Sequence, residues 1–359
     1  MRKCFFFSDS RRRLLLLYST RPAQSVWGIT VGQGESETGY FWEDGAWVKD
    51  YSVTWNPNQY EMAKDIRMPY NNQFTVGVER ELMESLSVGV TYIYKSSHDL
   101  LDMALTNGEY SSATWTDNEG PNATGKDFVI WSYESNPDDH VYRIYNPKKG
   151  DYDGLVGYTP YSKYSGLEFT LKKRYANKWQ LMASYVYSKA WGTSSNDHDS
   201  DGDNSFANSG AFAKSRNLQT NIDGRLFFDP THMFKLQGSI LLPFAVSLGA
   251  NFSYLSGMPY ARDARTPFET MDGSPLYLKT TQTGAYKMPD VVNLDISLGK
   301  EFSIGQFMMS VLVEATNLFN SSTTSEVVRR DWIEAERTFQ SVDSIVAPRR
   351  FRVGLSLKW

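Results

Sequence analysis

The C-terminal segment, residues 349–359, restricts most strongly what this chain can fold into. Apolar side chains occupy every second position of it: Phe351, Val353, Leu355, Leu357 and Trp359. Polar, charged or small residues stand between them, so a strand built from this segment has one apolar face and one polar face. Its length is close to the ~9–11 residues that a tilted strand needs to cross a bilayer. A free chain end normally frays unless it is tied down, so we expect this apolar strand to be held in place as the closing strand of a sheet.

The same alternation recurs upstream in four hairpins, each with a turn of about three or four residues. The paired runs are 74–78 with 86–94, 167–172 with 179–188, 234–240 with 246–254, and 292–298 with 309–315. Much longer segments connect the hairpins: 96–165, 192–230, 258–289 and 319–348. Such loops are uncommon inside a compact soluble domain. Short turns in the periplasm and long loops outside are typical of outer-membrane barrels.

We therefore predict an all-β fold, an antiparallel transmembrane β-barrel in the outer membrane of a Gram-negative bacterium. Nine strands follow from residue 73 onward, and Ser25–Val31 is expected to supply a tenth, with residues 33–72 as another outer loop. Ten is an even number, as single-chain bacterial barrels require. Lumen-facing charges are expected at Glu79, Lys95, Glu168, Lys172, Asp295 and Glu314. Small or polar lumen residues are expected at Gly77, Gly89, Thr170, Ser184, Ser239, Gly249, Asn251, Ser297, Gly354 and Ser356.

Aromatic residues make up 14% of the chain, and their positions are informative. One group stands near the long loops: Tyr92, Tyr94, Tyr185, Tyr187, Trp191, Tyr254, Tyr260 and Phe319. A second group stands near the short turns: Trp179, Phe244, Phe302 and Trp359. Aromatic residues favour strands in general, but only two aromatic girdles at the membrane interfaces explain these two positions.

Composition excludes several classes of protein. The net charge is -4, and the sequence pI is about 5.7, so nucleic acid is not expected as a partner. No apolar run reaches the ~18 residues of a membrane helix, and the mean hydropathy of -0.46 fits strands whose two faces average out. Cys4 stands alone, which rules out a disulfide framework and a cysteine metal site. Residues 1–23 are expected to be an uncertain or truncated start, because Ser8–Arg13 interrupts the apolar run before it reaches the ~7–15 residues of a signal peptide.

Four segments resemble the barrel of TonB-dependent outer-membrane receptors: Tyr70–Leu82, Tyr254–Tyr260, Val313–Asn320 and Arg349–Trp359. The chain is most similar to the Oar-like group, whose members carry a carboxypeptidase-regulatory-like domain at the front. The resemblance implies a 22-stranded barrel filled by a plug, which opens for an unidentified ligand when the TonB complex pulls on an N-terminal box. It also implies outer-membrane lipid as a partner, and barrel-assembly machinery that acts on the Trp359 end.

The sequence departs from that family pattern, since plug, TonB box and front domain are not seen in it. We therefore expect residues 24–359 to be the C-terminal portion of such a receptor, about ten strands of the larger barrel, and to lack transport activity alone. The alternative is a complete small outer-membrane barrel with an adhesin or structural role. An enzyme is not expected, because no Gly-x-Ser-x-Gly or His-Glu-x-x-His motif occurs and the four histidines (His98, His140, His198 and His232) are scattered in or beside loops.

One outer loop carries a pattern typical of metal ligands. Carboxylates occupy alternate positions: Asp197, Asp199, Asp201 and Asp203. Together with Gly202 they match the first half of a Ca²⁺ loop, although Asn208 stands where a bidentate glutamate belongs. Two interpretations stay open, a solvated acidic loop without a cofactor and a loop made rigid by Ca²⁺.

Aromatic residues of the outer segments also permit two interpretations. They are Trp115, Trp131, Tyr133, Tyr142, Tyr145, Tyr152, Tyr158, Tyr161 and Tyr164. Such rings can stack on a sugar or peptide ligand, or they can pack the loop on itself. The ligand and its binding residues cannot be named from the sequence.

Overall fold

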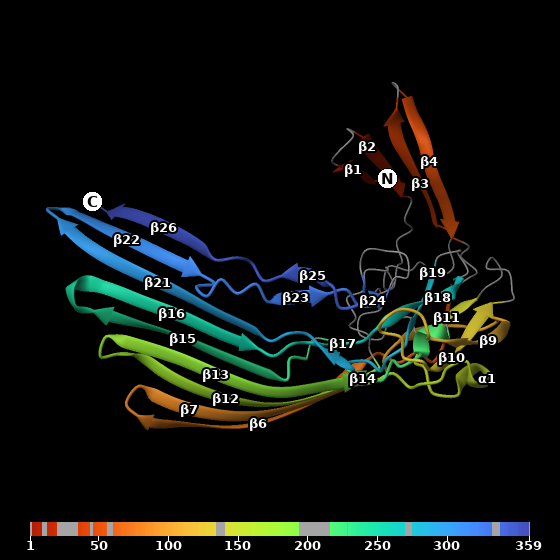
Figure 1. The fold of residues 1–359 in the computed structure, drawn as a ribbon, viewed down its shortest axis with the longest axis horizontal. Helices are drawn as coiled ribbons and strands as arrows, with labels where there is room; N and C mark the ends of the chain where they lie inside the picture. The colour runs from red at the N-terminus through yellow and green to blue at the C-terminus, as the bar shows by residue number, and fades with distance from the viewer. Residues whose placement is uncertain are drawn as a thin grey trace.

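The fold is dominated by one long antiparallel sheet (Figure 1). The computed structural model describes residues 2–8, 13–19, 35–43, 46–55, 60–133, 141–193, 216–227, 229–269, 275–331 and 338–358. Nine strands follow one another in chain order as a meander. They are β6 (Tyr70–Met83), β7 (Leu86–His98), β12 (Ser162–Ala176), β13 (Trp179–Gly192), β15 (His232–Leu242), β16 (Val246–Leu255), β21 (Val291–Ile304), β22 (Phe307–Thr316) and β26 (Arg350–Lys358). The predicted strands from residue 73 onward are thus confirmed.

Short turns join the strands within each hairpin, all at the end of the sheet drawn at the left of Figure 1. Several turn residues have positive φ angles, among them Ser85, Asn177 and Gly305. The turn between β15 and β16 contains the 3-10 helix η5 (Pro243–Ala245). The long connections all leave from the opposite end, as the alternation of turn lengths predicts.

The sheet is curved but open in the described part of the chain. Its order runs from β6 to β26, and these two edge strands do not pair with each other there. Figure 1 shows β26 and β6 on opposite sides of the curved sheet. The short β14 (Gly224–Arg225) adds to the loop end of β13.

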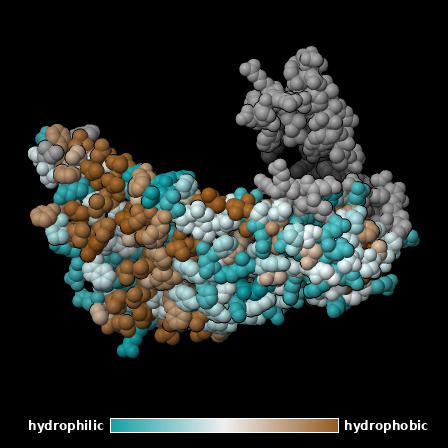
Figure 2. All heavy atoms as spheres, viewed as in Figure 1, coloured by the Kyte–Doolittle hydropathy of each residue, from teal (hydrophilic) through white to brown (hydrophobic). Residues whose placement is uncertain are grey.

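One face of this sheet is apolar and exposed. The side chains that the alternation assigns to lipid project from it, including Phe74, Val78, Phe169, Leu298, Val313, Val353 and Leu355. Val353 is 65% exposed and Leu355 is 74% exposed, values that an ordinary soluble sheet would avoid by packing. Figure 2 shows hydrophobic residues gathered over the part of the molecule that these strands form, and hydrophilic residues over the part that the long connections form.

The two aromatic girdles are only partly as expected. Tyr92, Tyr187, Trp191 and Phe319 are exposed near the loop end, and Trp179, Phe244 and Phe302 are exposed near the turns. The prediction for Tyr260 is wrong, because this side chain is 4% exposed. β17 (Pro259–Tyr260) pairs with β20 (Tyr286–Lys287) inside the outer loops, so the Tyr260 ring stacks on Tyr286 and contacts Phe339. Trp359 lies outside the described residues.

The long connections are not structureless. They contain a single helical turn, α1 (Asp151–Gly154), a 3-10 turn, η4 (Asn217–Gln219), and short strands. The strands are β5 (Tyr60–Met62), β8 (Asp102–Leu105), β9 (Tyr110–Thr116), β10 (Asp127–Tyr133), β11 (Tyr142–Tyr145), β18 (Asp263–Glu269), β19 (Pro275–Lys279), β23 (Thr324–Val327), β24 (Arg330–Asp331) and β25 (Val342–Ile345). Most of the buried apolar residues lie here rather than in the long sheet, because no second layer among the described residues covers the apolar face of that sheet.

Strands also occur before β6, in a separate four-stranded sheet. They are β1 (Arg2–Ser8), β2 (Arg13–Ser19), β3 (Glu35–Glu43) and β4 (Ala46–Trp55), and they pair in that order. The range 33–72, expected as an outer loop, therefore contains the strands β3, β4 and β5 and the first residues of β6. The predicted tenth strand, Ser25–Val31, lies outside the described residues.

The Asn-Leu-Phe-Asn segment of the sequence has a structural role at the loop end of the sheet. Asn317 adopts a left-handed conformation with φ 49°, and its side-chain amide donates to the carbonyls of Ser321 (2.9 Å) and Ala347 (2.8 Å). Its backbone amide donates to Asp295 at 2.9 Å. Asn320 accepts from the backbone amide of Arg349 at 3.0 Å. These bonds fix where β22 ends and β26 begins.

Candidate functional site

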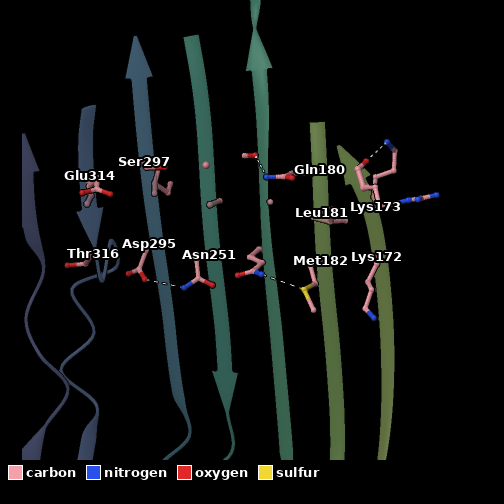
Figure 3. A pocket seen from close by; sticks show the side chains of 18 residues that line it. Lys172, Lys173, Gln180, Leu181, Met182, Asn251, Asp295, Ser297, Glu314 and Thr316 are labelled. Atoms are coloured by element: carbon pink, nitrogen blue, oxygen red, sulfur yellow. Dashed lines mark hydrogen bonds between the residues drawn. The ribbon is translucent and has the colours of Figure 1, made fainter. Parts of the chain in front are cut away.

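The concave face of the sheet carries a row of polar side chains from neighbouring strands. A hollow of about 710 Å³ lies on it, between β12 and β22. Figure 3 shows its lining, which comes from every strand in that interval. Several predicted lumen residues lie here together: Lys172, Ser239, Gly249, Asn251, Asp295, Ser297 and Glu314. The assignment of these residues to the concave face is confirmed.

Amide and hydroxyl groups form the middle of this hollow. Gln180 donates to the hydroxyl of Ser239 at 3.0 Å. One row further along, the side-chain amides of Asn251 (3.3 Å) and Asn293 (2.9 Å) donate to the carboxylate of Asp295. Register places these groups side by side, because Gln180 pairs with Ser239 and Asn251 pairs with Asp295 across neighbouring strands. The surface thus offers uncharged donors and acceptors around one fixed carboxylate.

Charged pairs stand at both margins of the hollow. On one side Arg174 contacts Glu81 at 2.9 Å, and Lys172 lies 3.9 Å from Glu79. On the other side the Arg352 guanidinium donates to Glu314 at 2.6 Å. Apart from the partly buried Glu314, these side chains are largely exposed, so each pair contributes only ~0–1 kcal/mol to stability. Their placement suits a water-filled or plugged interior better than a dry core.

The chemistry of this face is that of a binding or lining surface. No nucleophile stands beside a positioned base among the residues that line it. In the described part of the chain, no three His, Cys, Asp or Glu side chains come together as metal ligands. The acidic segment with Asp197, Asp199, Asp201 and Asp203 lies outside the described residues, so its two interpretations stay predictions. No helix among the described residues is long and apolar enough to cross a membrane.

The two histidines in the described part of the chain do not gather at a site. His98 stacks on Tyr70 with ring centres 5.1 Å apart, and its Nε2 lies 2.8 Å from the hydroxyl of Ser96. His232 begins β15, where its Nδ1 lies 2.8 Å from the hydroxyl of Tyr185. His140 and His198 lie outside the described residues. The two described histidines therefore support strand ends.

The outer loops hold a buried ionic cluster that the sequence did not reveal. Arg262 is 1% exposed and contacts Asp117 at 2.7 Å and Asp331 at 2.8 Å. Its guanidinium also donates to the hydroxyl of Thr280 at 2.8 Å. Asp117 in turn accepts the amide and the hydroxyl of Thr124, at 2.9 and 2.7 Å. The cluster connects segments from three separate connections, which the order of residues along the chain does not bring together.

Four aromatic side chains of the outer segments pack within the loops. Trp115, Tyr142, Tyr145 and Tyr158 are all buried. Tyr158 donates to the fully buried carboxylate of Asp102, and Tyr145 meets Tyr152 edge to face at 5.4 Å. Burial raises the pKa of Tyr145 above its ordinary value. Of the two interpretations of these rings, packing of the loop on itself is the one that applies to these four.

Comparison with known proteins identifies the family of this sheet. The model for the outer membrane beta barrel domain matches residues 19–257, more than half of the chain. The chain belongs to this outer-membrane β-barrel family. Its location is therefore the outer membrane of Gram-negative bacteria, where the apolar face of the sheet contacts lipid. No protein with a curated description matches its sequence.

Several solved outer-membrane structures are similar to this family member. The outer membrane transporter YddB from Escherichia coli is 10% identical with a TM-score of 0.46, over 95% of this chain and 40% of that one. The ferric-catecholate import receptor Fiu from E. coli K12 is 12% identical with a TM-score of 0.40, over 96% and 34%. The siderophore receptor PirA from Acinetobacter baumannii is 10% identical with a TM-score of 0.42, over 96% and 40%. The chain therefore spans two fifths or less of the length of each of these proteins.

Proposed function

We propose that this chain forms part of the wall of a TonB-dependent outer-membrane transporter and takes no part in catalysis. The observation that carries the proposal is the open order of the sheet, in which β6 and β26 do not pair with each other among the described residues. A barrel that includes these nine strands and more has a wider lumen than a small barrel filled by its own side chains.

The polar concave face supports the same proposal. Most side chains there are small or hydrophilic, and they leave a hollow of about 710 Å³ instead of packing against each other. A plug with a polar surface fits such a wall, and plugged lumens belong to barrels of about 22 strands. The proposal extends to the finer points of the resemblance, namely an Oar-like receptor, a C-terminal portion at residues 24–359, coupling to TonB, and assembly through the Trp359 end.

A small barrel with an adhesin or structural role is the second candidate. It is favoured by the outer loops, which have apolar cores of their own, such as the cluster of Trp115, Ile130, Ala264, Leu276 and Leu278. Loops that are rigid in this way can serve as a contact surface without transport. The hollow on the concave face counts against it, because the interior of a narrow barrel is filled by side chains.

Uptake tests the transport proposal even though the ligand is unidentified. Cells with and without this protein, in strains with and without a functional TonB complex, are fed an isotopically labelled extract of whole cells. We expect at least one labelled compound to accumulate only when both are present. Accumulation that is independent of TonB, or no compound that depends on this protein, would contradict the proposal.

Cysteine labelling tests the arrangement in the membrane. In a Cys4→Ser background, Asn118→Cys lies in an outer connection and Ser303→Cys at a short turn, and both positions are exposed. We expect a membrane-impermeant reagent to label Asn118→Cys on intact cells, and Ser303→Cys only after permeabilisation. Equal labelling of both on intact cells would contradict the topology.

A further inference from the structure

We propose that the free edge of β9 binds an extended, basic peptide segment of a partner protein, which adds to the β9–β10 hairpin as a further strand. β9 and β10 pair only with each other in the described part of the chain. They lie among the outer connections, at the end of the molecule opposite the short turns (Figure 1). The open edges of β6 and β26 are different, because they belong to the membrane wall. Binding at the edge of β9 takes place on the outer surface and does not depend on transport.

Hydrogen bonds to Asn217 show which way the backbone groups of the hairpin point. The side-chain amide of Asn217 donates to the carbonyl of Trp131 at 2.8 Å, and its oxygen accepts from the backbone amide of Trp131 at 2.9 Å. The backbone groups of Trp131 therefore point away from β9. Because Trp131 pairs with Ser112 in a regular register, the N–H and C=O of Ser112 point away from β10. Thr114, two residues further along, points its backbone groups in the same direction.

The outward backbone groups of Ser112 and Thr114 form an unpaired row. No backbone hydrogen bond outside the strand ladders involves either residue in the part of the chain that the structure describes. The whole run Ser111–Thr114 is exposed. Sheet edges are usually protected by charged side chains, proline or a bulge, and Tyr110–Thr116 contains none of these. An added strand would satisfy the edge of β9 as Asn217 does on the other side of the hairpin.

The charges around β9 favour a basic partner. Segment 109–127 carries four carboxylates and one lysine, which give it a net charge of -3. Glu109 just before β9 and Glu119 shortly after it are exposed, and neither has an ion-pair partner among the described residues. Pairing of β9 with the β9 of a second copy would bring two such segments together, so charge repulsion disfavours it. Lysine or arginine at the ends of an added strand would instead meet these carboxylates.

A small hollow at the end of β9 can accept one basic side chain. It has a volume of about 150 Å³. The charged groups that line it are the carboxylates of Asp117, Glu119 and Asp331 and the guanidinium groups of Arg262 and Arg265. The lining therefore has one negative charge in excess. A lysine of the added strand would balance this charge.

The test measures binding of a synthetic peptide to the full chain purified from outer membranes in a neutral detergent. The peptide has seven residues, as many as β9, with alternating threonine and valine between a lysine at each end. We expect saturable binding by fluorescence anisotropy, together with slower hydrogen exchange at the amides of Ser112 and Thr114. A peptide with glutamate in place of both lysines, and one with methylated backbone nitrogens, should each bind about tenfold more weakly.

Thr114→Pro removes an outward N–H donor, and proline is tolerated on an edge strand where its missing N–H faces solvent. We expect this variant to bind the lysine peptide about tenfold more weakly, because a carbonyl of the peptide loses its partner. Thr114→Ala is the matched control, since it keeps the backbone donor, and its binding should be unchanged. Glu109→Gln with Glu119→Gln should reduce the preference for the lysine peptide over the glutamate peptide about fivefold.

Equal binding by Thr114→Pro and Thr114→Ala would overturn the proposal, as would equal binding of the lysine and glutamate peptides or no saturable binding. Slow exchange at Ser112 and Thr114 before any peptide is added would also overturn it, because another segment of this chain or a second copy would then cover the edge. Light scattering separates these two occupants. If Thr114→Pro fails to fold, the peptide with methylated backbone nitrogens gives the same comparison on the unchanged protein.

Discussion

The Arg262 guanidinium and the Asp117 carboxylate, 145 positions apart in sequence, meet at 2.7 Å with both side chains 1% exposed. Asp331 completes the cluster, because its carboxylate accepts two hydrogen bonds from the same guanidinium. Burial of charge is costly unless the partners stay together, so the cluster works as a unit. It joins three outer connections to one another at the loop end of the sheet.

Replacing Arg262 with methionine should therefore loosen the outer loops. The change leaves two carboxylates without a cation, and breaking a buried ion pair typically costs about 3–5 kcal/mol. We expect faster amide hydrogen exchange in β9, β18 and β24, while exchange in β13 and β16 stays slow. Lys287→Met is the control, because the Lys287–Asp290 pair is half exposed and such pairs contribute about 0–1 kcal/mol. Equal effects of the two changes would contradict the assigned role of Arg262.

Acid should weaken the same outer body. Burial alone raises the pKa of Asp117, but hydrogen bonds from Arg262 and Thr124 outweigh it and hold that pKa below its ordinary value. A carboxyl group with a lowered folded pKa contributes stability that is present above the unfolded pKa, about 3.9 for aspartate, and is lost as pH falls through the folded value. The protection factors of the β9 amides, which are the ratios of intrinsic to observed exchange rates, should therefore fall below pH ~4 in the wild type. In Asp117→Asn these protection factors should already be low at neutral pH and change little with acid.

A second carboxylate, Asp290, should contribute to the stability of the folded protein, and this contribution should be lost over a defined pH range. Hydrogen bonds from the Lys287 ammonium, the Tyr254 hydroxyl and the Gly257 amide lower the pKa of Asp290 to about 2. Its contribution should be complete above pH ~4 and lost as pH falls toward about 2. Asp290→Asn should flatten the dependence of the urea midpoint on pH in this interval. An unchanged slope would show that these bonds do not stabilise the loop end of β21.

The apolar face of the last strand gives a prediction for membrane insertion. Val353 lies in the middle of β26 on the exposed apolar face, and Ser356 lies on the opposite face. Val353→Arg should destabilise the folded protein in lipid vesicles by about 2–4 kcal/mol, because arginine near the bilayer centre is that unfavourable. Ser356→Arg should have a mild effect. Comparable losses in a urea titration would mean that both faces of β26 are buried in protein.

Alternation along the strands was sufficient to predict the long sheet from the sequence. Each strand meets lipid on one face and water or polar groups on the other, so every second residue reports its environment. The same reasoning placed Asn251 and Asp295 on one face, because register follows once the turns are known. These are local signals, and they do not depend on distant contacts.

The outer loops could not be predicted in the same way. Tyr260 looks like a girdle residue by its distance from β16, but the pairing of β17 with β20 carries it into a core with Met288 and Phe339. Asp117, Arg262 and Asp331 carry no periodic pattern, because their environment is created by segments far apart in sequence. Each of these residues is an isolated charge in a loop segment. Such charges could only have been named as candidates for a buried ion pair, without their partners.

Gly257 provides the sharpest test of how the outer loops join the sheet. A side chain at this position would overlap the backbone carbonyl of Met288, and a backbone atom cannot move aside as the end of a flexible side chain can. Its amide also donates to Asp290 at 2.9 Å, so the close approach is fixed from both sides. Gly257→Ala should therefore lower the free energy of unfolding by about 3 kcal/mol, at the upper end of the usual cost of overpacking.

Gly354→Ala is the matched control, since the nearest atom to its added carbon would be 3.8 Å away, and we expect a change within about 0.5 kcal/mol. Urea titrations of both variants in lipid vesicles measure the difference, and a neutral Gly257→Ala would show that the chain after β16 does not pass against Met288.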